Sequence, residues 1–211
     1  MDGTLVDSER LCGDVIRKVC STLLHIELPE DEILSHTGML EREFYAMILE
    51  KYNVQYDLEK IMDLDGLLQV QDEWYNSQLD SVVPFPGAQE LPKLLKEKGM
   101  KMAVVSGSSH KQIDYILTKI GVRNLMDAIV SSEDYTIGKP DPTGYRLGAE
   151  KLGLDPIDCI GFEDAERWIQ ALNTVGALSV GVKNLGDSDI SKAQIQIDHL
   201  LDFLPHIDSL S

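Results

Sequence analysis

Four short polar clusters in the sequence hold residues that could bind or transform a phosphate group. They are Asp2-Gly3-Thr4, Ser106-Gly107-Ser108-Ser109, Gly138-Lys139-Pro140-Asp141-Pro142 and Glu163-Asp164. The small residues after Ser106 leave backbone N–H groups open before a predicted helix, which suits an anion. Lys139 supplies a cation, and Glu163 with Asp164 offers the hard oxygen ligands that Mg²⁺ takes. Together these are the parts of a phosphoryl-transfer site.

Each cluster also has a purely structural interpretation. The serines from Ser106 to Ser109 could cap a helix, and Asp164 could be a helix N-cap. Lys139 could be an ordinary loop lysine. The functional interpretation is favoured because the clusters follow one another in order, each at a predicted strand end. Functional groups of an open parallel sheet gather at the carboxyl ends of its strands.

The second half of the chain carries the elements that would position these clusters. The apolar pattern predicts strands over 100–105, 128–131, 159–162 and 178–182, with helices over 88–98, 111–120, 144–152 and 168–175. A last apolar stretch over 195–204 predicts a short edge strand and a closing helix. Strands that alternate with helices of this length indicate parallel β-α units. The predicted fold class is therefore α/β with a Rossmann-like parallel sheet.

The segment from Arg10 to about Val83 has a different pattern. Apolar residues recur at helical spacing over 11–24, with shorter helical stretches near 44–49 and 67–75. No strand signal appears there, and the turn-rich run Pro84-Phe85-Pro86-Gly87 ends the segment. This half predicts a small helical bundle.

Composition excludes several classes of partner. The 211 residues include 36 acidic and 19 basic side chains, a formal net charge of -17. Nucleic acid and anionic membranes are held mainly by clustered Lys and Arg, so neither is expected as a partner. Three cysteines without C-x-x-C spacing, no long apolar run and no signal-peptide pattern predict a cytoplasmic protein. We expect a monomer that binds a small molecule.

The four clusters resemble the four motifs of the haloacid dehalogenase superfamily of phosphatases and phosphomutases. The sequence Asp2 to Glu9 resembles the first motif and Val104 to Gly107 the second. Gly138 to Pro142 is similar to the third motif, and Gly161 to Asp164 to the fourth. The resemblance is nearest to the branch that holds β-phosphoglucomutase and small sugar-phosphate phosphatases. It implies an α/β core over 1–9 and 84–211 and a helical cap over 10–83.

The resemblance also implies a mechanism. An Asp nucleophile forms an aspartyl-phosphate, and an Asp two residues later, here Asp2, serves as acid and then base. Ser106 and Gly107 would bind the phosphoryl oxygens, and Lys139 would hold nucleophile and phosphate together. Mg²⁺ would be held by the backbone carbonyl of Asp2 and by Asp164, with Glu163 beside it. The cap would close over the substrate.

One departure concerns the nucleophile. The family pattern is Asp-x-Asp-Gly-Thr, and Met1 occupies the x position. We expect the nucleophilic Asp and the apolar strand before it to lie upstream of Met1 in the natural protein. The rival interpretation is a short, catalytically inactive relative. The chain as it stands is expected to be inactive as a phosphatase.

Two further departures concern the metal and the substrate. Trp168 stands where the related pattern has Gly, so the Trp side chain is either accommodated by local repacking or projects towards the site. In the cap, Glu41 stands where β-phosphoglucomutase-like proteins carry an Arg for a second phosphate, and Arg42 follows it. A carboxylate repels a second phosphate, which favours a hydrolase.

The sequence therefore predicts a Mg²⁺-dependent phosphatase of a small phosphorylated metabolite, with a sugar phosphate favoured. Two alternatives stay open. One is a β-phosphoglucomutase-like phosphosugar mutase, which Arg42 keeps possible. The other is a non-catalytic binding protein on the same fold, because fold does not by itself fix function.

Overall fold

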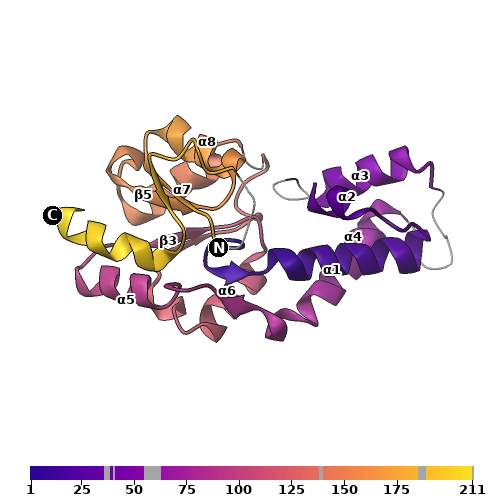
Figure 1. Cartoon of the computed structure of the whole chain (residues 1–211), viewed down its shortest axis with the longest axis horizontal. Helices are drawn as coiled ribbons and strands as arrows, with labels where there is room; N and C mark the ends of the chain where they lie inside the picture. Colours follow the sequence, from indigo (N-terminus) through magenta and orange to yellow (C-terminus); the bar gives the residue numbers. More distant parts are fainter. Residues whose placement is uncertain (36–38, 40, 55–62, 138–139, 185–188, 211) are drawn as a thin grey trace. The chain divides into compact units, whose positions relative to one another are not determined.

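The computed structural model describes residues 1–35, 39, 41–54, 63–137, 140–184 and 189–210 (Figure 1). The chain divides into two compact units, one of Met1–Asp7 with Val83–Ser211 and one of Ser8–Val82. We name them the core unit and the helical unit. Their borders lie one or two residues from those expected for a core and a cap, and the roles of core and cap stay predictions.

In the part that the structure describes, the parallel strands of the core unit form two separate sheets. In one, β3 (Ala103–Val105) pairs with β4 (Ala128–Val130). In the other, the order is β5 (Ile160–Glu163), β6 (Leu178–Val182) and β7 (Ile195–Ile197). Four helices alternate with these strands: α5 (Glu90–Glu97), α6 (His110–Lys119), α7 (Thr143–Leu152) and α8 (Glu166–Val175). The predicted α/β class with a Rossmann-like parallel sheet is confirmed.

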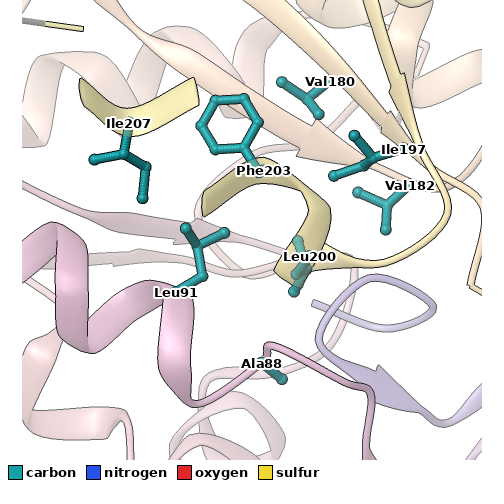
Figure 2. Close-up of a cluster of buried hydrophobic side chains, with 8 residues drawn as sticks. All are labelled: Ala88, Leu91, Val180, Val182, Ile197, Leu200, Phe203 and Ile207. Atoms are coloured by element: carbon teal, nitrogen blue, oxygen red, sulfur yellow. The ribbon is translucent and has the colours of Figure 1, made fainter. Parts of the chain in front are cut away.

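The strands form where apolar and β-branched residues follow one another, because such side chains fit a sheet covered on both faces. Val180 and Val182 of β6 are fully buried. They belong to a cluster formed with α5, β7 and the closing 3₁₀ helix η5 (Leu200–Leu210). Figure 2 shows Phe203 and Leu200 of η5 among these side chains. This cluster holds the C-terminal segment against the sheet.

A short antiparallel pairing connects the two ends of the helical unit. β1 (Val6–Asp7) pairs with β2 (Val83–Pro84), and the Phe85 N–H donates to the Leu5 carbonyl at 2.9 Å. No strand was predicted here, since each strand is two residues long and Pro84 lacks an N–H donor. The pairing makes the segment from Ser8 to Val82 an insertion into the core unit.

The described part of the helical unit consists of helices and the segments that connect them, as its apolar pattern predicted. Its helices are α1 (Glu9–Val19), the π-helical turn η1 (Cys20–Leu24), α2 (Glu30–Leu34), α3 (Glu41–Lys51) and α4 (Leu64–Asn76), with the 3₁₀ turn η2 (Leu79–Ser81). Leu11, Val15 and Val19 of α1 form the predicted buried stripe. Lys18 Nζ of α1 lies 4.2 Å from the ring centre of Trp74 on α4. In the described part of the core unit, 3₁₀ turns also occur at η3 (Arg123–Leu125) and η4 (Pro156–Asp158).

Candidate active site

The first two predicted clusters meet at the carboxyl end of β3. Ser106 is the first residue after this strand, and its Oγ donates a hydrogen bond to Asp2 Oδ2 at 2.7 Å. Ser108 Oγ donates to the same oxygen at 3.0 Å. The fold thus brings together residues more than 100 positions apart. A carboxylate held by two hydroxyl groups is a fixed proton acceptor at the strand end.

The neighbouring residues of the second cluster have separate roles. Ser109 caps α6 through a capping box with Gln112, so the capping interpretation holds for Ser109. Ser106 and Ser108 instead bond to Asp2. Gly107 lies between them, and none of the described residues comes within 4 Å of the position that a Cβ would take on it. The space on the side where a side chain would stand is therefore open among the described residues.

The fourth cluster meets the first. Thr4 Oγ1 donates to Asp164 Oδ1 at 3.0 Å, which joins the turn after Met1 to the end of β5. The N-cap residue of α8 is Ala165, without a side-chain cap, so the alternative of Asp164 as an N-cap is wrong. Asp164 is thereby held beside the turn that carries Asp2.

Glu163 has a partner that sequence reasoning missed. It is buried, with 5% of its surface exposed, and Tyr145 on α7 donates from its hydroxyl to Glu163 Oε1 at 2.5 Å. Burial raises the pKa of Tyr145 well above its ordinary value, and the negative charge of Glu163 raises it further. The phenol therefore stays protonated and keeps donating. A tyrosine on the apolar side of a predicted helix gives no sequence signal for such a role.

Asn184 is a second residue that the sequence did not single out. It lies two positions after the end of β6, and its side-chain amide donates to the Gly3 carbonyl at 2.7 Å. The same rule that singled out the four clusters, polar residues after parallel strands, could have found it. A lone Asn, however, is common in loops.

The described part of the structure does not show the other predicted residues at these contacts. Gly138 and Lys139 lie outside the described residues. Trp168 is in the first turn of α8 and is half-buried. In the helical unit, Glu41 begins α3, and Arg42 beside it forms an ion pair with Asp65. The predicted catalytic, phosphate-binding and metal-binding roles therefore stay predictions.

A cavity of about 430 Å³ in the core unit is lined by none of the residues that make these contacts. Asp114 and Asp127 are among its lining residues, and neither was predicted as a site residue. Asp114 is paired with Arg123 at 2.5 Å and Asp127 with Lys96 at 2.7 Å. This cavity is a surface hollow lined by ion pairs, and it adds no group to the candidate site.

The donor chemistry around Asp164 fits a magnesium ion. Among the described residues, no group of three or more His, Cys, Asp or Glu side chains is placed to hold a metal. Mg²⁺ does not need such a group, because it is usually bound by one or two carboxylates together with water and phosphate oxygens. Thr4 donates to one of the two carboxylate oxygens of Asp164. A carboxylate oxygen is the kind of ligand that Mg²⁺ takes, so the chemistry of Asp164 fits the ion.

A parallel Rossmann-like sheet with carboxylates and hydroxyls at its strand ends is typical of enzymes that act on phosphorylated ligands. Comparison with known proteins gives the family. The family model of haloacid dehalogenase-like hydrolases matches residues 1–176. The chain therefore belongs to the haloacid dehalogenase-like hydrolases, as its four motifs predicted.

Relatives and solved structures agree with this assignment. The chain is 30% identical over 210 residues to the validoxylamine A 7'-phosphate phosphatase of Streptomyces hygroscopicus subsp. limoneus, covering 98% of this chain and 95% of that protein. It is 27% identical to the bifunctional riboflavin kinase/FMN phosphatase of Arabidopsis thaliana, covering 88% of this chain but 47% of that protein. The crystal structure of β-phosphoglucomutase from Clostridium difficile matches with a TM-score of 0.85 at 25% identity, over 99% of this chain and 93% of that one. No helix in the described part of the chain is both long and apolar enough to cross a membrane.

Proposed function

We propose that the protein is a Mg²⁺-dependent phosphatase of a small phosphorylated metabolite, with a sugar phosphate favoured. The contact between Ser106 Oγ and Asp2 Oδ2 carries this proposal, because it joins the expected phosphate ligand to the expected acid–base residue. Membership of the hydrolase family and the phosphatase names of its relatives support the reaction class.

The catalytic roles are assigned to this chain's own residues. Asp2 protonates the leaving oxygen of the substrate and then takes a proton from the attacking water. Ser106 and the backbone at Gly107 bind the phosphoryl oxygens, and Lys139 neutralises their charge. Ser108 fixes the Asp2 carboxylate from a second side. Each of these groups positions or stabilises charge, which is what phosphoryl transfer requires of a protein.

Asp164 and the backbone carbonyl of Asp2 are proposed to hold Mg²⁺, with Glu163 beside them. When bound, the ion neutralises charge that builds up on the transferred phosphoryl group. The hydrogen bonds from Thr4 and Tyr145 keep the two carboxylates in place before the ion arrives. Such outer partners commonly matter for metal affinity almost as much as the ligands.

The nucleophile is proposed to be an Asp that follows a further strand, upstream of Met1. The burial and the edge pairing of the strands support a further strand in this part of the core unit. Val180 and Val182 of β6, which has a neighbour on each side, are fully buried. By contrast, Val105 of β3 and Phe162 of β5 are half-buried, and among the described residues each strand is paired along one edge only. A strand between β3 and β5 would cover both edges.

The mutase alternative receives less support from the helical unit. A phosphosugar mutase has to hold a second phosphate, and Arg42 is the cation that kept this alternative open. Its guanidinium is paired with Asp65, so the cation that a second phosphate would need is already engaged. The neighbouring Glu41 supplies no cation in its place, so the hydrolase is the preferred proposal.

A phosphate-release screen with the natural protein, Mg²⁺ and a panel of sugar phosphates tests the proposal. We expect activity that requires Mg²⁺ and falls at least about 100-fold in Asp2→Asn, which keeps the shape of the side chain but cannot exchange the proton. Ser106→Ala should be impaired more than Ser108→Ala, because both variants lose one hydroxyl from Asp2 but only Ser106 is assigned to phosphate. A chain that begins at Met1 should be inactive.

Several outcomes would overturn the proposal. Family-like turnover by the chain that begins at Met1 would exclude an upstream nucleophile. Interconversion of glucose 1-phosphate and glucose 6-phosphate with hexose bisphosphate would establish the mutase instead. Binding of a sugar phosphate without any turnover by the natural protein would favour the non-catalytic alternative.

A further inference from the structure

Asn184 combines features that are individually uncommon. Its φ of +46° lies in the left-handed region, which non-glycine residues seldom adopt, although Asn tolerates it better than most. Its backbone N–H donates to the Asp198 carbonyl at 2.8 Å, which holds this conformation at the end of β6. Backbone strain of this kind persists where the surrounding structure requires it, and it is concentrated at functional sites.

The side chain of Asn184 links this position to the first motif. Nδ2 donates to the Gly3 carbonyl at 2.7 Å and to the Thr4 carbonyl at 3.2 Å. Because both partners are acceptors, the amide nitrogen must face them. The opposite atom, Oδ1, is then buried with no hydrogen-bond donor among the described residues. A buried acceptor without a partner costs free energy, so the orientation is set by the two carbonyls.

The turn that Asn184 holds is itself joined to Asp164. Thr4 Oγ1 donates to Asp164 Oδ1, while the Cα of Gly3 faces Asp164 Oδ2 so closely that a Cβ would lie 2.0 Å from it. A shift of the turn by a few tenths of an ångström would therefore move or crowd the carboxylate. Asn184 therefore bonds to two residues that contact Asp164, Gly3 and Thr4.

We propose that Asn184 is a positioning residue for the metal site. It fixes the carbonyls of Gly3 and Thr4, so that the Asp2 backbone carbonyl and the Asp164 carboxylate face one ion. This inference rests on the proposed function, because it takes these two groups as the Mg²⁺ ligands. It explains why an Asn stands here: the position needs an amide donor together with tolerance of a left-handed backbone. Gln or Lys could supply a donor, but neither tolerates the backbone as well.

The test measures Mn²⁺ binding to the natural protein without substrate, from the loss of the free Mn²⁺ signal in electron paramagnetic resonance. Asn184→Gly removes the donor and also relieves the left-handed strain. Asn184→Asp keeps the shape but faces the two carbonyls with an acceptor. We expect both variants to bind Mn²⁺ about 10-fold more weakly or worse, as for other partners of metal ligands.

Two matched variants control for effects on folding. Asn53 in the helical unit has a φ of +48°, so Asn53→Gly relieves the same strain away from the core unit. Asn173 donates from Nδ2 to the Lys192 carbonyl at 3.0 Å, so Asn173→Asp removes the same kind of bond elsewhere in the core unit. Both controls should bind Mn²⁺ as tightly as the wild type, even where their thermal stability changes.

A second measurement does not involve the metal. Amide hydrogen exchange of residues 1–8 should become faster in Asn184→Gly and stay unchanged in Asn53→Gly. If Asn184→Gly binds Mn²⁺ within a factor of two of the wild type, Asn184 does not position the site and the inference is wrong. If the wild type itself does not bind Mn²⁺, the proposed metal site fails instead, which is a different result.

Discussion

Gly3 and Asp164 are in direct contact across the candidate site. A Cβ placed on Gly3 would lie 2.0 Å from Asp164 Oδ2 and 2.6 Å from its Cγ. Gly3 also has a φ of +69°, where a side chain meets the following carbonyl oxygen. A glycine is therefore required for two reasons: the backbone conformation of the turn after Asp2, and the close approach of the Asp164 carboxylate.

Substitution of Gly3 by Ala should consequently cost more than the backbone strain alone. We expect Gly3→Ala to lower the free energy of unfolding by about 1–3 kcal/mol more than Gly99→Ala, which is the usual range for overpacking. Gly99 has a similar φ of +76°, and no atom of the described residues lies within 4 Å of its Cβ position, so it measures the strain without the crowding. Urea denaturation of both variants checks the difference. Equal losses would mean that Asp164 moves aside freely.

The bond from Tyr145 to Glu163 gives a second prediction. Tyr145→Phe removes the hydroxyl that donates to a buried carboxylate, and should lower the free energy of unfolding by about 1–3 kcal/mol. Tyr135→Phe is the control, because its hydroxyl donates to the Ser106 carbonyl at 3.4 Å, too long for a strong bond. Its loss should be below about 0.5 kcal/mol. A Tyr145→Phe variant as stable as the wild type would show that Glu163 finds another donor.

Much of the core unit could be predicted from the sequence, because its strands and helices are long enough for the apolar period to be recognised. The predicted strand over 178–182 is β6, and Ser106 directly follows β3 as expected. The short pairing of Val6–Asp7 with Val83–Pro84 could not be predicted, since two residues carry no period. Strand order could not be predicted, because local pattern does not determine which strands pair.

The candidate site was also predicted only in part. Asp2, Ser106 and Asp164 were recognised because they belong to ordered clusters at strand ends. Tyr145 and Asn184 were missed, although each donates a hydrogen bond to a predicted cluster. Their roles depend on tertiary distances, and a single tyrosine in a helix or asparagine in a loop has many other uses. Sequence motifs identified the residues expected to act, while the structure was needed to find those that hold them.

Asp134 gives a prediction about pH. Its carboxylate accepts hydrogen bonds from the Ser131 N–H at 2.8 Å and the Ser131 hydroxyl at 3.1 Å, and it pairs with Lys151 at 3.1 Å. The backbone N–H of Ser131 is the largest cause, and Lys151 the next, that lower the pKa of Asp134 to about 2 from an ordinary 3.8. The His110 imidazole also lies 2.9 Å from this carboxylate. The folded state thus favours ionised Asp134.

Because the folded-state pKa is the lower one, Asp134 stabilises the protein fully above pH 4 to 5. This contribution is lost as the pH falls from about 4 towards 2, where the folded protein also takes up the proton. Asp134→Asn should therefore lower the free energy of unfolding by about 1–2 kcal/mol at pH 7, allowing for partial solvent screening. The difference from wild type should shrink at pH 3. Urea denaturation at both pH values measures it, with Asp14→Asn, an exposed partner of Arg17, as the control that should change little at either. A loss of the same size at pH 3 and pH 7 would mean that the carboxylate acts through its shape and not its charge.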